Sequence, residues 1–485
     1  MEEGASDGLF CFKIRVFLAK VNLSELKGLE MTSLNIVILA AGQGTRMRSD
    51  RPKILHTVGG KPLLQHVYER ARELNPETTA IVYGHGGEQV RQRFPDWSAH
   101  WVEQSPQLGT GHAVQQALPV LRDDALILVL YGDVPLLQRP PLERLLSVAA
   151  TDTLALLTVD MNDPTGYGRI VRDADGRVVR IVEEKDAAAE EKRITEVNTG
   201  ILAVPGFKLK TWLDRLDNDN AQGEYYLTDV IAMAATEGMM IETVSAPPND
   251  VAGVNNKRQL AALERIYQSR QAEDLLDRGV TLRDPARFDL RGDLEAVGRD
   301  VEIDVNVLLE GTVRLGHRVK IGPQVVIRDA VIGDDVEIMS HSVIEQAEIG
   351  ARSRVGPFAR IRPETVLAEE AHVGNFVEIK KSTLGGGTKV NHLSYIGDSE
   401  VGAGVNVGAG TITCNYDGAN KHKTVIEDGA FIGSDTQLVA PVKVGRDATI
   451  GAGSTITHDA PAEKLTLSRS KQFTIEHWQR PTKQR

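Results

Sequence analysis

The chain has 485 residues, 41% hydrophobic and 25% charged, with a formal net charge of −11. This length predicts two or three domains, and the acidic balance excludes a general nucleic-acid or membrane-surface binder, because both need a basic footprint. With only Cys11 and Cys414, the chain has no disulfide framework or thiolate metal site, which fits a reducing cytoplasm.

The N-terminal segment, residues 1–30, is expected to be a disordered extension ahead of the fold. Three basic residues interrupt its apolar stretch, and two glutamates precede that stretch. Signal peptides have the opposite order of charge, and no run of the chain reaches the roughly 18 apolar residues of a membrane span. We therefore expect a cytoplasmic protein whose fold begins at Met31.

The first domain is expected over residues 31–257. Residues 35–41 form a continuous apolar run, which predicts a buried strand. Helical and strand-like segments alternate after this run. Such alternation predicts an α/β domain with a mostly parallel sheet.

A glycine-rich loop after that first strand is the first candidate site. It differs from a dinucleotide-binding loop because Met47 stands where Gly or Ala is needed, and no Gly-Lys-Ser/Thr follows as in a P-loop. Free backbone amides around Gly42 and Gly44, at a helix N-terminus, would suit a triphosphate or a leaving pyrophosphate together with Arg46 and Lys53. A purely structural turn is the alternative.

A second apolar run, residues 126–130, ends in Tyr131-Gly132-Asp133. In open α/β sheets ligands bind at the carboxyl ends of strands, so Asp133 is a candidate Mg²⁺ ligand beside the phosphate loop. Its alternative role is a helix cap or turn former. The segment 107–111 opens another predicted helix, where backbone amides could bind the edge of a base.

The second domain follows a linker helix predicted over residues 258–279, and covers residues 280–485 including a C-terminal tail. From 297 to 461, aliphatic residues recur every six positions. A six-residue period is typical of a parallel β-helix with three hexads in each coil. The period slips to five at four places and breaks where residues 414–423 are inserted. Regular coils need no insertion, so we expect it to mark a site.

Arg362 and Lys380 occupy the same hexad position on successive coils, about 4.8 Å apart. Two such cations repel each other by about 1 kcal/mol even in water, so they are either solvated or bind an anion between them. His392 follows, with Tyr395 in the same hexad. Most histidines are structural or solvated, but beside an anion site a neutral imidazole could deprotonate an amine.

Several motifs resemble those of sugar-1-phosphate nucleotidyltransferases. They are LAAGQGTRM at 39–47 with Pro52-Lys53, Gln104 with QLGTGH at 107–112, YGDVP at 131–135, DPTGYG at 163–168, EVNTG at 196–200 and GVNN at 253–256. With the hexapeptide repeats, residues 31–469 resemble the bifunctional bacterial family that has N-acetylglucosamine-1-phosphate uridyltransferase and glucosamine-1-phosphate acetyltransferase activities. The resemblance implies an α/β Rossmann-like nucleotidyltransferase domain followed by an all-β left-handed parallel β-helix.

The resemblance also implies which residues serve uridylyl transfer to N-acetylglucosamine-1-phosphate. The expected contacts are Leu39, Ala40, Ala41 and Gly42 for the nucleotide, Arg46 and Lys53 for phosphate charge, Gln104, Gly109 and Thr110 for uracil, Gly168, Glu183 and Asn198 for the sugar, and Asp133 and Asn255 for Mg²⁺.

For acetyl transfer from acetyl-CoA, the resemblance makes His392 the general base, with Glu378 as a plausible orienting group. The expected contacts are Arg362, Lys380, Tyr395 and Asn406 for glucosamine-1-phosphate, and Ala409, Asn415, Tyr416, Ser434, Ala452 and Arg469 for acetyl-CoA. A homotrimer acting on small molecules, without a nucleic-acid or membrane partner, is implied as well.

Two other interpretations keep the same folds. One is a single-function sugar-nucleotide pyrophosphorylase with a regulatory β-helix, and the other is a non-catalytic scaffold. Both predict a β-helix without the set Arg362, Lys380, His392 and Asn415, and neither explains the insertion. The scaffold also predicts loss of Lys53 or Asp133, which are present.

Overall fold

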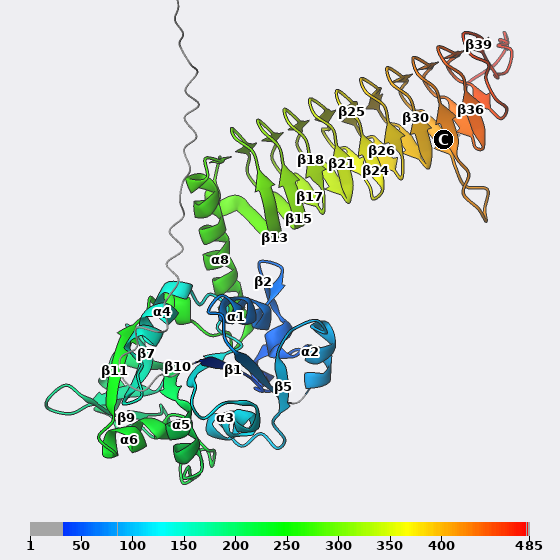
Figure 1. Cartoon of the computed structure of the whole chain (residues 1–485). Helices are drawn as coiled ribbons and strands as arrows, with labels where there is room; N and C mark the ends of the chain where they lie inside the picture. Colours follow the sequence, from blue (N-terminus) through cyan, green and yellow to red (C-terminus); the bar gives the residue numbers. More distant parts are fainter. Residues whose placement is uncertain (1–32, 85, 482, 484–485) are drawn as a thin grey trace, which may run out of the picture. The chain divides into compact units, whose positions relative to one another are not determined.

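The computed structural model describes residues 33–84, 86–481 and 483, so the expected extension over 1–30 lies outside the described residues. Two compact units are present. The first contains the described residues up to His56 together with Leu63–Asn256, and the second contains Thr57–Pro62 together with the chain from Lys257 onward (Figure 1). Among the described residues, no helix is long and apolar enough to cross a membrane.

The first unit is built on a nine-stranded sheet that is mostly parallel, as predicted. Its main path runs β11-β7-β10-β6-β1-β4-β5, in which β10 is antiparallel to its neighbours, and β8 and β9 extend it. The strands are β1 Leu34–Ala40, β4 Thr78–Tyr83, β5 His100–Glu103, β6 Leu126–Tyr131, β7 Thr153–Asp160, β8 Arg169–Arg172, β9 Val178–Val182, β10 Glu196–Pro205 and β11 Met240–Ser245.

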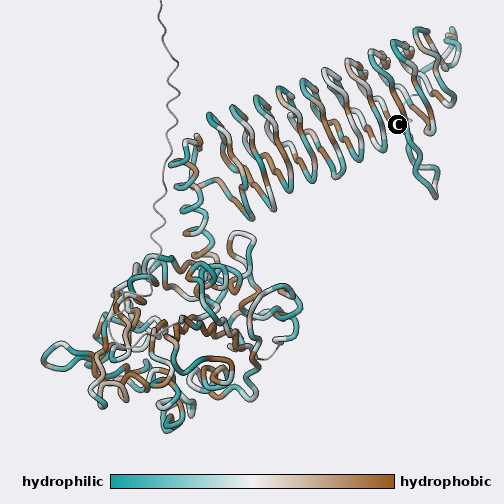
Figure 2. Tube along the Cα trace, in the orientation of Figure 1, coloured by the Kyte–Doolittle hydropathy of each residue, from teal (hydrophilic) through white to brown (hydrophobic). Residues whose placement is uncertain are grey.

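Helices cover both faces of this sheet because alternate residues of its central strand face two separate cores. Ile36 and Ile38 belong to the core under α1 and α4, whereas Val37 and Leu39 belong to the core under α3, α5 and α6. Figure 2 shows the hydrophobic strands at the centre of the unit. The helices are α1 Leu63–Arg72, α2 Gly87–Arg93, α3 Thr110–Ala117, α4 Arg139–Val148, α5 Gly206–Leu213, α6 Asp229–Thr236 and α7 Pro248–Val251, with 3-10 turns η2 Thr45–Met47, η3 Lys53–Leu55, η4 Leu118–Val120 and η5 Glu191–Arg193.

The second unit starts with helix α8 (Lys257–Asp277) and the turn η6 (Pro285–Arg287), and continues as a parallel β-helix with three faces. The first face is an eleven-stranded sheet of β12 Thr281–Leu282, β14 Glu302–Ile303, β16 Lys320–Ile321, β19 Glu337–Ile338, β22 Arg354–Val355, β25 His372–Asn375, β28 Lys389–His392, β31 Asn406–Val407, β34 Phe431–Ile432, β37 Thr449–Ile450 and β39 Leu465–Thr466.

The other two faces share a seventeen-stranded sheet, which starts with β13 Phe288–Val297 and β15 Val307–Leu315. The second face consists of β17 Val326–Arg328, β20 Val343–Glu345, β23 Arg360–Ile361, β26 Glu378–Lys380, β29 Tyr395–Gly397, β32 Ile412–Cys414, β35 Gln437–Val439 and β38 Thr455–Ile456. The third face consists of β18 Val331–Ile332, β21 Ala347–Ile349, β24 Thr365–Leu367, β27 Thr383–Leu384, β30 Ser399–Val401, β33 Thr424–Ile426 and β36 Val442–Val444.

The aliphatic residues of the hexads stack inside these coils, as the period predicts. On the first face Ile321 pairs with Ile338 and Val355 with Val373, and each of these side chains is at most 2% exposed. Burying one such side chain stabilises the fold by about 1.5–3 kcal/mol, so the repeat itself supplies the core. The predicted break is also present, because Val401 pairs with Ile426 across a coil lengthened by the insertion.

One short hairpin, β2 Thr57–Val58 with β3 Lys61–Pro62, belongs to the second unit although its sequence lies within the first. The Gly59 amide donates to Glu264 at 2.8 Å, and Lys61 pairs with Asp293 at 3.0 Å. A Cβ on Gly59 would lie 2.1 Å from the Tyr267 ring, so only glycine fits there. The sequence did not predict that this hairpin packs in the second unit.

Candidate active sites

The first candidate site is a cavity of about 450 Å³ in the first unit. It lies where β1 and β6 end, and these parallel strands bring Leu39 opposite Tyr131. The lining residues that were predicted are Leu39, Ala41, Gly42, Lys53, Gln104, Gly109, Thr110 and Asp133, together with Gln107 of the predicted base-binding segment. Those that were not predicted are Gln43, Ala113, Tyr131 and Glu224.

The glycine-rich loop wraps closely around Lys53. Gly44 has a φ of 65°, and a Cβ there would lie 2.7 Å from the Lys53 side chain. The expected helix after the loop is wrong: a single 3-10 turn, η2, follows, in which the Met47 amide bonds to the Gly44 carbonyl at 2.8 Å. Met47 is buried, which explains why the loop departs from the dinucleotide-binding pattern.

Both expected Mg²⁺ ligands are held by expected phosphate-binding cations. Lys53 forms an ion pair with Asp133, and their side chains are only 12% and 17% exposed. Arg46 donates to the Asn255 side-chain oxygen at 3.0 Å. The Val254 amide bonds to the Asp133 carbonyl at 2.9 Å, so the two ligand loops are joined.

These two oxygens fit Mg²⁺. Mg²⁺ is usually bound by one or two protein oxygens together with substrate phosphates and water. No group of three or more His, Cys, Asp or Glu side chains among the described residues could hold a metal by itself. The donor set therefore suits a metal that arrives with a nucleotide.

Gln104 and Gly109 are fixed by the backbone around them. Gln104 is 4% exposed and donates to the Gly109 carbonyl at 2.9 Å, with His112 Nδ1 at 3.1 Å from the same nitrogen. Burial lowers the pKa of His112, which favours the neutral ring that can accept this bond. Gly109 has a φ of 111°, and a Cβ there would lie 2.6 Å from the Tyr225 carbonyl.

The three expected sugar contacts form a cluster next to the cavity. The Asn198 amide bonds to the Gly168 carbonyl at 2.8 Å, and a Cβ on Gly168 would lie 3.4 Å from the Glu183 carboxylate. Burial raises the pKa of Glu183, although Thr228 donates to it at 3.1 Å. Burial also raises the pKa of Tyr131, followed by the charges of Glu183 and Asp133, so Tyr131 connects this cluster to the cavity.

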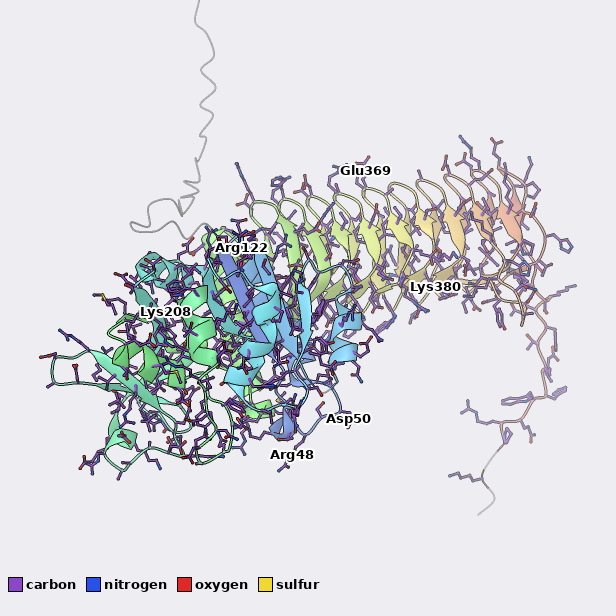
Figure 3. All side chains as sticks on the ribbon, turned by 60° about the horizontal axis from the view of Figure 1, so that its bottom comes forward. Arg48, Asp50, Arg122, Lys208, Glu369 and Lys380 are labelled. Carbon is purple, nitrogen blue, oxygen red and sulfur yellow. The ribbon has the colours of Figure 1, made fainter. Side chains whose placement is uncertain are left out.

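The second candidate site lies on the β-helix, and its predicted stacking is correct. Ile361 pairs with Ile379, which puts Arg362 and Lys380 one coil apart on the second face. Arg362, however, pairs with Glu378 at 2.6 Å, an ion pair that raises the pKa of Arg362. Within one chain the Glu378 carboxylate therefore pairs with Arg362, and His392 Nδ1 has a different partner, Asn375. Figure 3 shows Lys380 and Glu369 on different sides of the coils.

Asn375 is the residue that holds His392. The two side chains stand opposite each other on β25 and β28, with His392 Nδ1 at 2.9 Å from Asn375 Oδ1. Because an amide oxygen only accepts, Nδ1 is the donor in this bond, and the lone pair of the neutral ring is then on Nε2. This is the tautomer that a general base needs.

A column of equivalent positions continues from His392 along the β-helix. The register pairs Val390 with Val407, Val407 with Ile432 and Ile432 with Ile450. The residues two positions after these are His392, Ala409, Ser434 and Ala452, and Arg469 donates to the Ala452 carbonyl at 2.9 Å. We call these five residues the base column. From His392 to Ala452 the column spans three coil spacings, or about 14 Å.

The insertion forms a small hairpin beyond the end of β32. Asp417 accepts bonds from the Ala419 and Asn420 amides at 2.8 and 2.6 Å and from His422 at 2.7 Å. These bonds hold the pKa of Asp417 well below its usual range. The hairpin brings Lys421 next to Lys380, and this contact lowers the pKa of Lys421.

The known proteins that resemble this chain cover nearly all of it. Family models match residues 36–201 (MobA-like NTP transferase domain), 294–384 (GMPPB C-terminal domain) and 423–458 (bacterial transferase hexapeptide, six repeats). The bifunctional protein GlmU of Methylococcus capsulatus is 64% identical over 93% of this chain and 98% of its own length. Those of Alkalilimnicola ehrlichii and Azoarcus sp. are each 59% identical over 93% of this chain and cover 97% and 100% of their own lengths.

The chain belongs to the GlmU family. It is thus a bifunctional enzyme of UDP-N-acetylglucosamine synthesis, with a uridylyltransferase and an acetyltransferase on one chain, as its motifs predicted. The hexapeptide match likewise confirms the left-handed parallel β-helix. Neither the regulatory nor the scaffold interpretation is supported.

Within this GlmU-family chain the residues expected to serve acetyl transfer fall into two groups on different faces. The first group lies on or just beyond the second face, and we call it the second-face group: Arg362, Lys380, Tyr395, Asn415, Tyr416 and Lys421. The base column and Asn406 lie on or next to the first face. Lys421 was missed by sequence reasoning, although its place in the insertion was a usable signal. Tyr131 was missed as well, although its motif was recognised.

Proposed function

We propose that the cavity of the first unit performs the uridylyl transfer with the residues that its motifs single out. Residues 39–42 would bind the nucleotide, Gln104, Gly109 and Thr110 the uracil, and Gly168, Glu183 and Asn198 the sugar. The observation that supports this most is the partly buried Lys53–Asp133 ion pair, which lies in the cavity at the carboxyl ends of two parallel strands.

In this proposal the sugar phosphate oxygen attacks the α-phosphorus of UTP in line, and pyrophosphate leaves. Asp133 and Asn255 would hold Mg²⁺, which when bound supplies positive charge to the phosphates. Lys53 and Arg46 would then leave the side-chain oxygens of Asp133 and Asn255 and bind phosphate oxygens instead. The protein thereby positions the reactants and stabilises charge, without a covalent intermediate.

We further propose that His392 is the general base of acetyl transfer to glucosamine-1-phosphate. Nε2 takes a proton from the sugar amine, the amine nitrogen forms a bond with the thioester carbonyl carbon, and the C–S bond of acetyl-CoA breaks. The proton then passes from the imidazole to the leaving thiolate. Arg362, Lys380, Tyr395 and Asn406 would bind the sugar phosphate, and the rest of the base column with Asn415 and Tyr416 would bind acetyl-CoA.

A homotrimer would complete this second site. The second-face group and the base column belong to different faces of one coil, so one chain does not present them to a single substrate. Packing the second face of one copy beside the first face of the next would bring the insertion of one chain to His392 of another. We also infer a cytoplasmic location, where UTP and acetyl-CoA are made.

The test supplies glucosamine-1-phosphate, acetyl-CoA, UTP and Mg²⁺ to the full chain and detects UDP-N-acetylglucosamine by chromatography. Failure to form it would contradict the proposal. For the assembly, His392→Ala and Asn415→Ala chains are unfolded and refolded together. Shared sites predict that the mixture regains acetyl transfer that neither variant has alone, whereas a site within one chain predicts no recovery.

A further inference from the structure

A large cation buried in the first unit is not used by the proposed chemistry. Arg169, at the start of β8, is 1% exposed. Its guanidinium donates to the Glu184 carboxylate at 2.7 Å and to the Tyr167 carbonyl, while its Nε is buried without a partner. Taking a charge out of water is expensive, and a well-packed apolar side chain is often more stable than a buried ion pair. Stability alone therefore gives no reason for an arginine here.

Arg169 and Glu184 stand directly beside two expected sugar contacts. Arg169 pairs with Val182 across the β8–β9 ladder, so Gly168 and Glu183 follow as the next pair toward the cavity. A Cβ on Gly168 would touch Ile181 at 2.8 Å and the Glu183 carboxylate at 3.4 Å, so this approach is tight. A small shift of either strand end would change the distance between the two contacts.

The same ion pair also fastens the loop that leads into β8. Glu184 accepts a second bond from the Gly166 amide at 3.3 Å, and these two bonds lower the pKa of Glu184. Gly166 has a φ of 87°, which favours glycine, and its amide is held by the bond to Glu184. The guanidinium thus joins three segments: the 163–167 loop, the start of β8 and the end of β9.

We propose that Arg169 is a positioning residue for the sugar half of the uridylyl site. Through Glu184 and the Tyr167 carbonyl, its planar fork sets the spacing between Gly168 and Glu183, and so the affinity for the N-acetylhexosamine phosphate. Lysine cannot replace it, because a single ammonium lacks the two-pronged geometry. The inference rests on the proposed function, which assigns Gly168 and Glu183 to the sugar.

The experiment measures uridylyl transfer by Arg169→Lys and Arg169→Met at saturating UTP and Mg²⁺. The KM for N-acetylglucosamine-1-phosphate should rise on the order of tenfold or more, since small misplacements of binding groups have effects of this size. The KM for UTP and the acetyl-transfer rate of the same chain should stay within about twofold of wild type. Arg172→Lys is the matched control, because Arg172 lies on the same strand and pairs with Glu196 through two bonds of 2.8–2.9 Å away from Gly168.

An unchanged sugar KM in the Arg169 variants, or an equal rise in the UTP KM, would overturn the proposal. If the Arg169 variants do not fold, Glu184→Gln decides, since it weakens the same ion pair without removing the guanidinium. Glu183→Gln distinguishes a failure of the positioning role of Arg169 from a failure of the sugar assignment. A raised sugar KM in Glu183→Gln with wild-type values in Arg169→Lys and Glu184→Gln overturns the positioning role alone. A wild-type sugar KM in Glu183→Gln overturns the sugar assignment and this inference with it.

Discussion

Asp229, the first residue of α6, should make the first unit less stable as pH rises. Burial, followed by the nearby charges of Asp217, Glu183 and Asp186, raises the pKa of Asp229 from 3.8 to about 6. The unfolded chain then loses its proton at lower pH than the folded chain. Stability therefore falls between pH 4 and 6 and is constant above about pH 7.

The size of the effect follows from the shift. About two pKa units correspond to roughly 3 kcal/mol at full ionisation, and partial solvent contact reduces this value. A carboxylate at a helix N-terminus also contributes about 0.3–1 kcal/mol that asparagine would lose. We therefore expect Asp229→Asn to increase the free energy of unfolding by about 1–2 kcal/mol at pH 8, and by much less at pH 4.5.

Urea unfolding followed by tryptophan fluorescence can measure this difference, because Trp97, Trp101 and Trp212 lie in the first unit. The exposed Asp175, changed to asparagine, is the control and should show no dependence of this size. The reasoning is refuted if Asp229→Asn is less stable than wild type at pH 8. A difference that is the same at pH 4.5 and pH 8 would refute it equally.

Three further predictions concern the two sites. His392→Ala should abolish acetyl transfer and leave uridylyl transfer near normal. Asn375→Ala should slow acetyl transfer about tenfold, because the His392 ring loses the hydrogen bond that fixes its tautomer, and loss of such a supporting bond often has an effect of this size. A parallel loss of both activities in a folded variant would argue against two separate sites. Lys53→Met should abolish uridylyl transfer yet tighten Mg²⁺ binding without nucleotide, measured by calorimetry, because Asp133 loses its ion pair; weaker Mg²⁺ binding would remove Asp133 from the metal site. Asp417→Ala should open the inserted hairpin and reduce acetyl transfer on the order of tenfold, since its turn loses bonds worth about 1 kcal/mol each; an unchanged rate would show that the hairpin is not part of the site.

The fold could be predicted almost completely because its signals are local. A six-residue period fixes which side chains enter the coil, and the pairing of Ile361 with Ile379 follows from counting alone. The break at the insertion is equally local, and so is the buried strand β1 before the glycine-rich loop. These features depend on the order of residues and little on their distant neighbours.

The partners of individual side chains could not be predicted in the same way. Counting puts Glu378 near both Arg362 and His392, but Glu378 lies on β26 of the second face and His392 on β28 of the first, and in one chain Glu378 pairs with Arg362. Asn375 was overlooked because its role depends on the register of two strands 17 residues apart. The hairpin around Gly59 joins the second unit through contacts with α8, and no local sequence pattern predicts these contacts.

Both candidate sites hold their cations in arrangements that a phosphate would improve, and this supports the proposed phosphate-binding roles of these residues. In the first, Lys53 and Arg46 occupy the oxygens of Asp133 and Asn255, which a metal arriving with the nucleotide would take. Lys53 and Arg46 would then be free to bind the phosphates of the nucleotide. In the second, Lys380 and Lys421 lie side by side, and like charges at close range repel unless an anion binds between them. In the proposed mechanism, substrate binding would therefore end the competition of the cations for oxygens in the first site and the repulsion between cations in the second, so each site would favour its bound state.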